Sequence, residues 1–292
     1  MTEKPYIIQT MSRGDLDISA SWADSEGWNP GLYDADCFHA ADPTGFFKGV
    51  LGDEVIATIS AVKYGGSFGF IGLYIVKPEY RGQGYGLKLW KAALDTLKGR
   101  NIGLDGVLAQ QENYKKVGFQ FSYLDTRYEG VGTGHGSAPG HEDIVDLSKV
   151  PFETLLAYDQ SCFPCDRTPF LRCWIHQPDS VALAALQHDK LAGYGVIRPA
   201  RKGYKIGPLF ADDPSRAEAL LLALTSRVAS GAPIYLDVPK INPAAVALAE
   251  KHGMKPVFET ARMYTQARPD LAYVHLFGVT TLDLGSCTIA RS

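Results

Sequence analysis

The chain has 292 residues, 46% of them hydrophobic and 21% charged, which is enough for two globular domains with ordinary cores. Its 29 Lys and Arg residues against 32 Asp and Glu residues give a net charge of −3, without the basic excess of a nucleic-acid-binding protein. No apolar run approaches the ~20 residues that span a membrane, and residues 1–10 lack a signal-peptide pattern, so we expect a cytoplasmic protein without a membrane or nucleic-acid partner.

The first half of the chain alternates between strand and helix patterns. Ser12, followed by Asp15, is typical of a helix-capping pair, and Gly52-Asp53 has the composition of a hairpin turn. The stretch 68–76 is apolar on both faces, as in a central strand, and Gly72 within it indicates a β-bulge. In chain order we expect a strand at 6–9, a helix from Ser12, a break at 28–31, a helix at 32–39, strands at 46–50, 55–62 and 68–76, a helix after residue 86, a strand at 103–107, a helix at 112–117 and a strand at 119–128.

The second half repeats this order of elements. The expected elements are a strand at 144–147, helices at 152–162 and 168–176, strands at 181–187, 192–198 and 204–210, a helix at 214–230, a strand at 234–238, a helix at 244–252 and a strand at 257–264. Lys116-Val-Gly-Phe119 and Lys251-His-Gly-Met254 each close a helix before a last strand, which aligns the two halves. The glycine-rich stretch 131–140 is typical of a linker. We therefore predict two domains, 1–135 and 136–292, each of α+β (mixed α/β) class with a mixed, mainly antiparallel sheet flanked by helices.

The five cysteines are scattered, and their odd number does not suggest a disulfide framework. Cys162 and Cys165 have the CxxC spacing of redox and metal pairs. No second CxxC or nearby His pair completes a tetrahedral site, so we interpret the spacing as coincidence and expect no metal.

The segment from Arg81 to Gly86 reads Arg-Gly-Gln-Gly-Tyr-Gly and stands between a predicted strand and a predicted helix. Glycines let the backbone approach a ligand closely, and a helix N-terminus attracts an anion. Arg81 can add charge-assisted hydrogen bonds to a diphosphate. The segment therefore predicts a pyrophosphate-binding loop.

Other interpretations of a glycine-rich loop fit this position less well. A dinucleotide fold carries its loop after the first strand of a βαβ unit, whereas this loop follows an antiparallel run of strands. A P-loop ends in Gly-Lys-Ser/Thr, and this loop does not. A purely structural turn is the third alternative, since glycines serve tight turns in any fold.

Two segments of the first half, Ile75–Gly86 and Gln110–Phe119, together resemble the GNAT superfamily of N-acetyltransferases. The first is similar to its acetyl-CoA motif, with the core Arg/Gln-x-x-Gly-x-Gly/Ala. The second is similar to its next motif, where a tyrosine precedes Gly-Phe at fixed spacing. The resemblance covers residues 5–130 well and is weak in motif beyond them. It implies an acetyl-CoA-dependent enzyme in tandem form, with an active N-terminal half and a degenerate C-terminal half.

The resemblance also implies roles for residues of these motifs. In such enzymes the amine attacks the thioester directly, and Tyr114 would act as general acid to the leaving thiolate. The other interpretation of Tyr114 is a helix tyrosine packed under the sheet. The thioester carbonyl would accept a hydrogen bond from the backbone N–H of Ile75 or Val76. The expected cofactor-binding residues are Tyr74, Ile75, Val76, Arg81, Gly82, Gln83, Gly84, Tyr85, Gly86, Asn113 and Lys116.

The acceptor side is less well defined. The resemblance places it beside the first two helices, so the candidate substrate-binding residues are Glu26, Trp28, Asn29, Asp34 and Asp36. Their acidic side chains can anchor a cation and Trp28 can stack on one, although residues 28–31 also have the composition of a simple turn. No residue declares itself as the general base, for which the candidates are Asp36, His39, Asp105 and Glu112.

The second half lacks the corresponding features. Asp212 and Asp213 stand where the glycine loop would be and would repel a diphosphate, and Ala249 stands where the first half has Tyr114. Asp213 followed by Pro214 instead predicts a well-formed helix start. The second half can then complete the acceptor pocket, mediate assembly or sense a ligand.

The function that the sequence favours is transfer of an acetyl group from acetyl-CoA to a primary amine of a small molecule, such as a simple amine, a polyamine or an amino acid. The alternatives are a protein or peptide acceptor, and a non-catalytic acyl-CoA-binding sensor. A homodimer is compatible with the sequence, which identifies neither the acceptor nor the preferred acyl chain.

Overall fold

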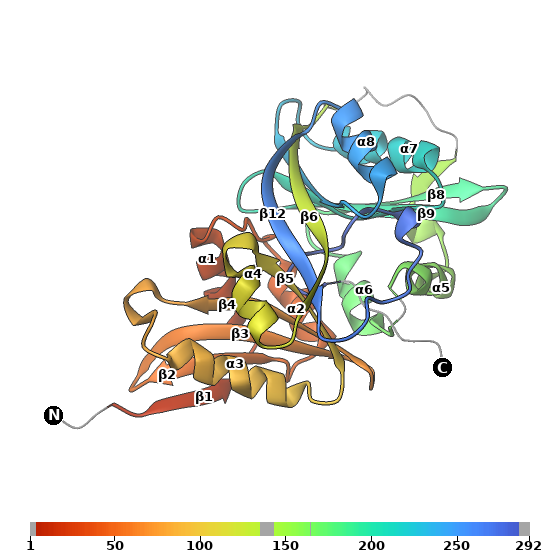
Figure 1. The fold of residues 1–292 in the computed structure, drawn as a ribbon. Coiled ribbons are helices and arrows are strands. Elements are labelled where there is room, and N and C mark those ends of the chain that lie inside the picture. Colours follow the sequence, from red (N-terminus) through yellow and green to blue (C-terminus); the bar gives the residue numbers. More distant parts are fainter. Residues whose placement is uncertain (1–3, 135–142, 164, 286–292) are drawn as a thin grey trace.

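The computed structural model describes residues 4–134, 143–163 and 165–285, and its elements follow the predicted order twice (Figure 1). The first half comprises β1 (Tyr6–Thr10), α1 (Leu16–Ser25), α2 (Asp34–Ala41), β2 (Phe46–Leu51), β3 (Glu54–Tyr64), β4 (Phe68–Val76), α3 (Tyr85–Thr96), β5 (Asn101–Val107), α4 (Gln111–Lys116) and β6 (Gln120–Val131). The second half comprises β7 (Ile144–Asp146), α5 (Phe152–Cys162), α6 (Thr168–Trp174), β8 (Val181–Gln187), β9 (Lys190–Pro199), β10 (Tyr204–Ala211), α7 (Pro214–Thr225), β11 (Pro233–Pro239), α8 (Pro243–Lys251), β12 (Lys255–Tyr264) and β13 (Leu276–Gly278). The predicted boundary between residues 135 and 136 lies outside the described residues.

The first helix begins later than predicted. The backbone N–H and the hydroxyl of Ser12 both donate to the Asp15 carboxylate, at 2.8 and 2.9 Å, and the Asp15 N–H donates back to the hydroxyl at 3.3 Å. This pair has the reciprocal bonding that the sequence predicts, but it closes a turn that precedes the helix. The helix itself starts at Leu16, with Asp15 as its N-cap residue.

The described strands form one mixed sheet in the order β1-β2-β3-β4-β5-β12-β6-β11-β10-β9-β8-β7, with β13 paired to β10. The pairs β4–β5 and β10–β11 are parallel, and the other pairs are antiparallel. A mixed, mainly antiparallel sheet flanked by helices in each half confirms the predicted fold class.

The two halves exchange their last strands. β12, from the second half, pairs with β5 between Thr260–Val107 and Tyr264–Gly103, whereas β6, from the first half, pairs with β11 from Asp125 to Val131. β6 and β12 also pair with each other, and they cross between the halves side by side in Figure 1. The sequence predicts each last strand in chain order but not this exchange, which makes the two sheets continuous.

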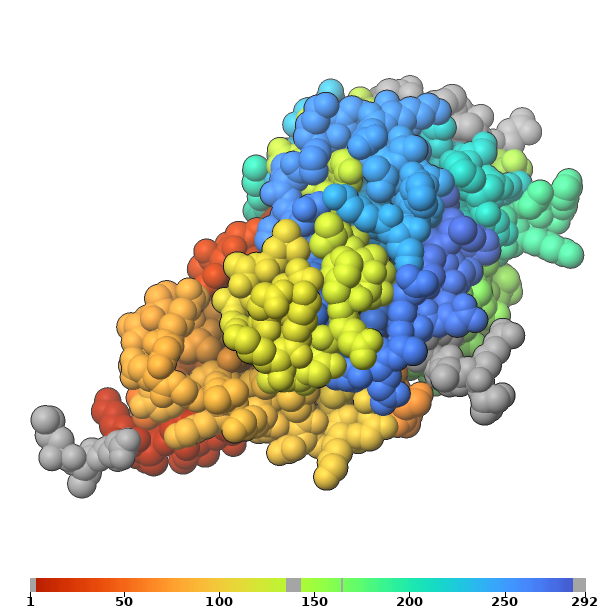
Figure 2. All heavy atoms as spheres, viewed as in Figure 1, coloured from red at the N-terminus to blue at the C-terminus, as the bar shows by residue number. Residues whose placement is uncertain are grey.

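Helices cover both faces of the sheet. A core on one face joins the halves, because α1 and α2 share it with α6 and with β9. On the other face of the first half, α3 packs on β2, β3 and β4. In the second half, α7 packs on β8, β9 and β10, and α8 packs on β11 and β13. Figure 2 shows the blue atoms of the second half lying directly against the yellow atoms of the first. No helix in the described ranges has the length and apolar character to cross a membrane.

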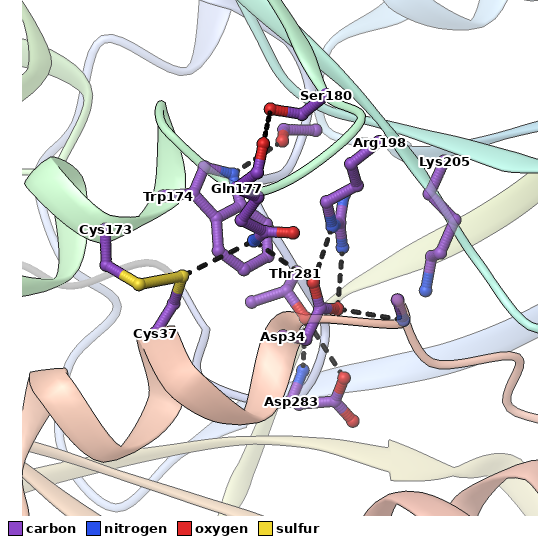
Figure 3. Close-up of polar contacts among 12 residues, drawn as sticks. Asp34, Cys37, Cys173, Trp174, Gln177, Ser180, Arg198, Lys205, Thr281 and Asp283 are labelled. Atoms are coloured by element: carbon purple, nitrogen blue, oxygen red, sulfur yellow. Dashed lines mark hydrogen bonds and ion pairs between the residues drawn. A yellow bond between two sulfur atoms is a disulfide. The ribbon is translucent and has the colours of Figure 1, made fainter.

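Within the described residues, a disulfide joins the halves. Cys37 of α2 is bonded to Cys173 of α6, 136 positions further along the chain (Figure 3). The cysteine count gives no indication of this bridge, so the expectation from the cysteine pattern is wrong for this pair. Cys162, the first cysteine of the CxxC pair, is a buried free thiol.

Candidate active site

β4 and β5 separate halfway along β4. They pair in parallel from Phe68 to Ile71 of β4, and no later residue of β4 pairs with β5 in the described register. The register between β3 and β4 then shifts at the next residues, and Leu73 has a positive φ of 46°. The Thr58 hydroxyl donates to the Leu73 carbonyl at 3.1 Å and holds this bulge in place. The predicted bulge at Gly72 is confirmed, and the rest of β4 presents an edge to open space.

The loop between β4 and α3 has a conformation that favours glycine. Gly82 and Gly84 have φ values of 76° and 84°, and nothing lies within 4 Å of a Cβ added to either. Gly84 is the N-cap residue of α3, and no side chain caps the helix. The first-turn N–H groups of α3 are therefore available to an anion.

A cavity of about 640 Å³ lies between the separated strands and reaches the loop. Most of the predicted site residues line it, namely Glu26, Trp28, Tyr74, Ile75, Val76, Arg81, Gly82, Gly84, Gly86, Asn113 and Tyr114. Arg81 is held at this cavity by two contacts: its Nε donates to the Val76 carbonyl at 2.8 Å, and its guanidinium forms an ion pair with Glu26. The loop, the bulge and Tyr114 thus share one cavity.

Tyr114 is mostly buried against aromatic side chains. Its ring stacks on Trp90, with centroids 5.5 Å apart, and lies over Gly106 of β5, where an added Cβ would be 2.4 Å from the ring. Burial and the neighbouring Tyr74 raise the pKa of the Tyr114 hydroxyl to about 12. The hydroxyl is therefore protonated at neutral pH and can donate a proton or a hydrogen bond.

Three candidate acceptor residues do not line the cavity. Asp34 is fully buried and forms an ion pair with Arg198, Nε to Oδ1 at 2.7 Å. Asp36 pairs with Arg13 on the surface, and Asn29 bonds to the backbone of residue 202. Among the candidate acceptor residues, Glu26 and Trp28 line the cavity.

Three expected cofactor-binding residues do not line the cavity. The side-chain amide of Gln83 donates to the Glu79 carbonyl, and the Tyr85 ring packs on Tyr6 with centroids 4.9 Å apart. Lys116 is exposed at the end of α4. Of the expected contacts of Gln83 and Tyr85 with a diphosphate, those of the backbone remain possible.

Among the base candidates, Asp105 lines the cavity and the others do not. Glu112 is exposed and pairs with Lys115, and His39 is half-buried in α2. The Asp105 carboxylate accepts two hydrogen bonds of 2.6 Å from the Arg262 guanidinium. No group of three or more His, Cys, Asp or Glu residues within the described ranges is placed to hold a metal ion.

The second half completes the cavity with residues that the sequence analysis missed. Phe258 and Thr260 come from the exchanged strand β12, and Leu282 and Asp283 come from the segment after β13. Arg127 of β6 also lines the cavity, with its guanidinium bound by Asp237 at 2.6 and 2.9 Å. No local motif marks these positions, because the exchanged strand β12 and the segment after β13 bring distant parts of the chain to the cavity.

In the second half, β10 and β11 separate as β4 and β5 do in the first, and a later segment of the same chain fills the space between them. β10 and β11 pair only from Tyr204 to Ile206 of β10, and β13 then pairs with β10 at Leu209 and Phe210. The Val279 N–H, just after β13, donates to the Asp237 carbonyl of β11 at 2.9 Å. β13 thus occupies the space between β10 and β11 that corresponds to the cavity of the first half.

Known proteins resemble both halves of the chain. A family model described as the acetyltransferase (GNAT) family matches residues 13–119, and one described as an acetyltransferase (GNAT) domain matches residues 155–278. A holothin acyltransferase from a Pseudoalteromonas species is 28% identical over 284 residues, which cover 97% of this chain and 94% of that protein.

Two solved structures share the fold of the whole chain. A protein from Pyrococcus horikoshii, assigned as an acetyltransferase, has a TM-score of 0.80 at 23% identity, over 96% of each chain. A tandem GNAT protein from the clavulanic acid biosynthesis pathway has a TM-score of 0.60 at 14% identity, over 91% of this chain and all (100%) of that one.

The two acetyltransferase models match the two halves of the chain, and the fold agrees with that of a tandem GNAT protein. The chain is therefore a tandem enzyme of two acetyltransferase domains. The chain belongs to the GNAT superfamily of N-acetyltransferases, and it is an acyltransferase.

Proposed function

We propose that this chain transfers the acetyl group of acetyl-CoA to a primary amine of a small molecule, by direct attack in a ternary complex. The observation that carries the proposal is the convergence of the Arg81–Gly86 loop, the bulge at Gly72 and Tyr114 on one cavity. The glycine-rich loop supplies an anion site, and the cavity beside it is lined by apolar and aromatic residues suited to a thioester.

In this proposal, bound acetyl-CoA extends from the loop along β4. The N–H groups at the start of α3, together with Arg81, bind the diphosphate. The pantetheine arm follows the edge of β4 at Tyr74–Val76, which has no pairing with β5 in the described register. The thioester carbonyl accepts a hydrogen bond from the backbone N–H of Ile75 or Val76, so that negative charge on this oxygen is stabilised during attack.

Tyr114 assists the departure of CoA. The amine nitrogen attacks the carbonyl carbon, the C–S bond breaks, and the Tyr114 hydroxyl donates a hydrogen bond and then its proton to the thiolate. A proton released by the new amide nitrogen returns to Tyr114 through water. The raised pKa of Tyr114 keeps the hydroxyl protonated between turnovers.

A small acceptor fits the enclosure better than a protein chain. Phe258, Leu282 and Asp283 of the second half line the cavity together with β4, the loop and α3 of the first half. The holothin acyltransferase is named for acyl transfer to holothin, and a structural neighbour belongs to clavulanic acid biosynthesis. Neither name mentions a protein acceptor.

We also propose that the chain has one cofactor site, in the first half. The second half places Asp213 as the N-cap of α7, where its side chain accepts the Arg216 N–H at 3.0 Å, and a carboxylate there repels a diphosphate. Ala249 is buried where the first half has Tyr114. β13 fills the remaining space between β10 and β11.

Acyl-transfer assays on a panel of primary amines test the proposal, with Tyr114→Phe as the diagnostic variant. We expect this variant to lose about 100-fold or more in turnover while it binds CoA as the wild type does, because only the proton donor is removed. Tyr128→Phe, on a buried tyrosine of β6 outside the cavity, is the matched control. CoA binding without turnover of any amine by the wild type would instead favour a non-catalytic sensor.

A further inference from the structure

The cavity is lined by three acidic side chains, Glu26, Asp105 and Asp283. Glu26 is paired with Arg81, and Asp105 is held by Arg262 through two hydrogen bonds. Among the described residues, Asp283 has no cation within ion-pair distance, and its carboxylate accepts one hydrogen bond, from the Thr281 hydroxyl at 3.1 Å. Of these three carboxylates, Asp283 is therefore the one whose negative charge is least compensated by neighbouring side chains.

The backbone places Asp283 at the bulge of β4, in the cavity of the proposed site. A Cβ added to Gly72 would lie 2.1 Å from the Asp283 carbonyl oxygen, so the two backbones are in direct contact at the bulge. The next residues on each side hold this segment in place: Leu282 lines the cavity, and the Leu284 carbonyl accepts the Tyr64 hydroxyl at 3.1 Å. The segment therefore holds Asp283 against the point where β4 and β5 separate.

We propose that Asp283 is the general base for the acceptor: its carboxylate binds the substrate ammonium in the cavity and removes its proton before attack. The proposal rests on the proposed function and adds the acceptor class, a primary alkylamine that arrives protonated. Asp283 takes one proton from the ammonium, and the free amine forms the N–C bond as the C–S bond breaks. Tyr114 supplies the thiolate proton, and the proton released by the new amide nitrogen returns to Tyr114 through water. Asp283 then returns its proton to water.

The surroundings of Asp283 suit this role. Burial raises its pKa, Lys205 of β10 and Arg127 of β6 lower it, Asp34 of α2 raises it, and the Thr281 hydroxyl lowers it, with a net upward shift. Figure 3 shows Asp283 below Asp34 and joined to Thr281 by dashed lines, with the side chains of Arg198 and Lys205 directed toward the same region. A carboxyl with a raised pKa is a better proton acceptor than an ordinary surface aspartate.

The test compares wild type with Asp283→Asn at saturating acetyl-CoA, using an alkylamine that the wild type acetylates. We expect kcat/KM for this amine to fall about 100-fold at neutral pH, and the loss to shrink as rising pH deprotonates the amine in solution. An aromatic amine, which is already neutral at pH 7, should retain most of its turnover in the variant. Asp95→Asn, on the exposed face of α3, is the matched control.

Thr281→Val gives a second readout that does not remove the carboxylate. Loss of the hydroxyl that donates to Asp283 should raise the pKa of this carboxyl and move the acid limb of the pH profile to higher pH. This variant decides the question if Asp283→Asn fails to fold.

Three results would overturn the assignment of Asp283. They are a folded Asp283→Asn variant with unchanged kcat/KM, an equal loss for alkyl and aromatic amines, and an unmoved acid limb in Thr281→Val. If the wild type acetylates no amine at all, the proposed function itself fails, and the role of Asp283 fails with it.

Discussion

Gly84 and Gly86 stand two positions apart in the loop and are glycines for different reasons. Gly84 has a φ of 84° with open space around an added Cβ, so its requirement is conformational. Gly86 lies inside α3, where an added Cβ would be 2.5 Å from the Tyr74 hydroxyl oxygen and 2.8 Å from a Val76 methyl carbon. Gly86 thus sets how closely α3 approaches Tyr74 and Val76, at the end of β4 that lines the cavity.

We expect Gly86→Ala to weaken CoA binding about tenfold, because the added methyl must displace Tyr74 and Val76 in a packed contact. Titration calorimetry with CoA measures the effect. Gly14→Ala is the control, since the nearest atom to its added Cβ is the Ser12 hydroxyl oxygen at 3.9 Å. Equal CoA affinities for the two variants would show that CoA binding does not depend on the close contact of Gly86 with β4.

The glycine motif indicates the loop conformation but not the contact of Gly86. The positions of Gly82 and Gly84 follow from the motif, since a turn before a helix commonly needs a positive φ. The contact between Gly86 and Tyr74 depends on how a helix packs on a strand, which a single sequence does not display. The same limit applies to Asp34, whose acidity suggested a ligand role although Arg198, 164 residues away, occupies its carboxylate.

At the scale of elements, strand positions were predictable and strand partners were not. β4 runs from Phe68 to Val76 as predicted, because its apolar pattern and flanking turns are local features. β6 and β12 have similar patterns and follow similar glycine turns, with Gly118 and Gly253 both at positive φ. Either half could accept either strand on pattern alone, so local sequence does not determine the exchange.

α2 is tied to β9 by a buried ion pair. The Asp34 carboxylate binds the Arg198 guanidinium, whose side chain also lies over the Trp174 ring at 4.2 Å. Both charged side chains are almost fully excluded from solvent, 2% and 1% exposed respectively. Removing one partner would leave the other charge buried and uncompensated.

We therefore expect Asp34→Asn to lower the free energy of unfolding by about 3 kcal/mol or more. Asp36→Asn, on the same helix, breaks a surface pair with Arg13 and should cost less than about 1 kcal/mol. Chemical denaturation of both variants measures the difference. Similar losses of unfolding free energy in the two variants would show that burial does not determine how much an ion pair stabilises the fold.

The same pair predicts how stability depends on pH. Burial by itself would raise the pKa of Asp34, but Arg198 outweighs burial and holds that pKa below its ordinary value. A group with a lowered folded-state pKa stabilises the fold above its unfolded pKa, about 3.9, and loses this contribution as pH falls through the folded value. Below about pH 4, the stability difference between wild type and Asp34→Asn should therefore shrink, as unfolding measured across this range will show.

At the scale of the molecule, the segment after β12 serves both halves. It forms β13 between β10 and β11, and then continues to Leu282 and Asp283 at the cavity of the first half. The loop and Tyr114 were predictable because they belong to motifs. The contribution of this segment was not, because a three-residue strand and a single aspartate carry no local pattern.

One consequence is the number of cofactor sites. We expect calorimetric titration with CoA to give one site per chain, because β13 already pairs with β10 in the second half and Asp213 caps α7 with a negative charge. Gly84→Val, which forces a β-branched residue into a positive φ in the loop, should abolish binding rather than leave a second site. A stoichiometry of two in the wild type, or a residual site in Gly84→Val, would show that the space held by β13 can open to the cofactor.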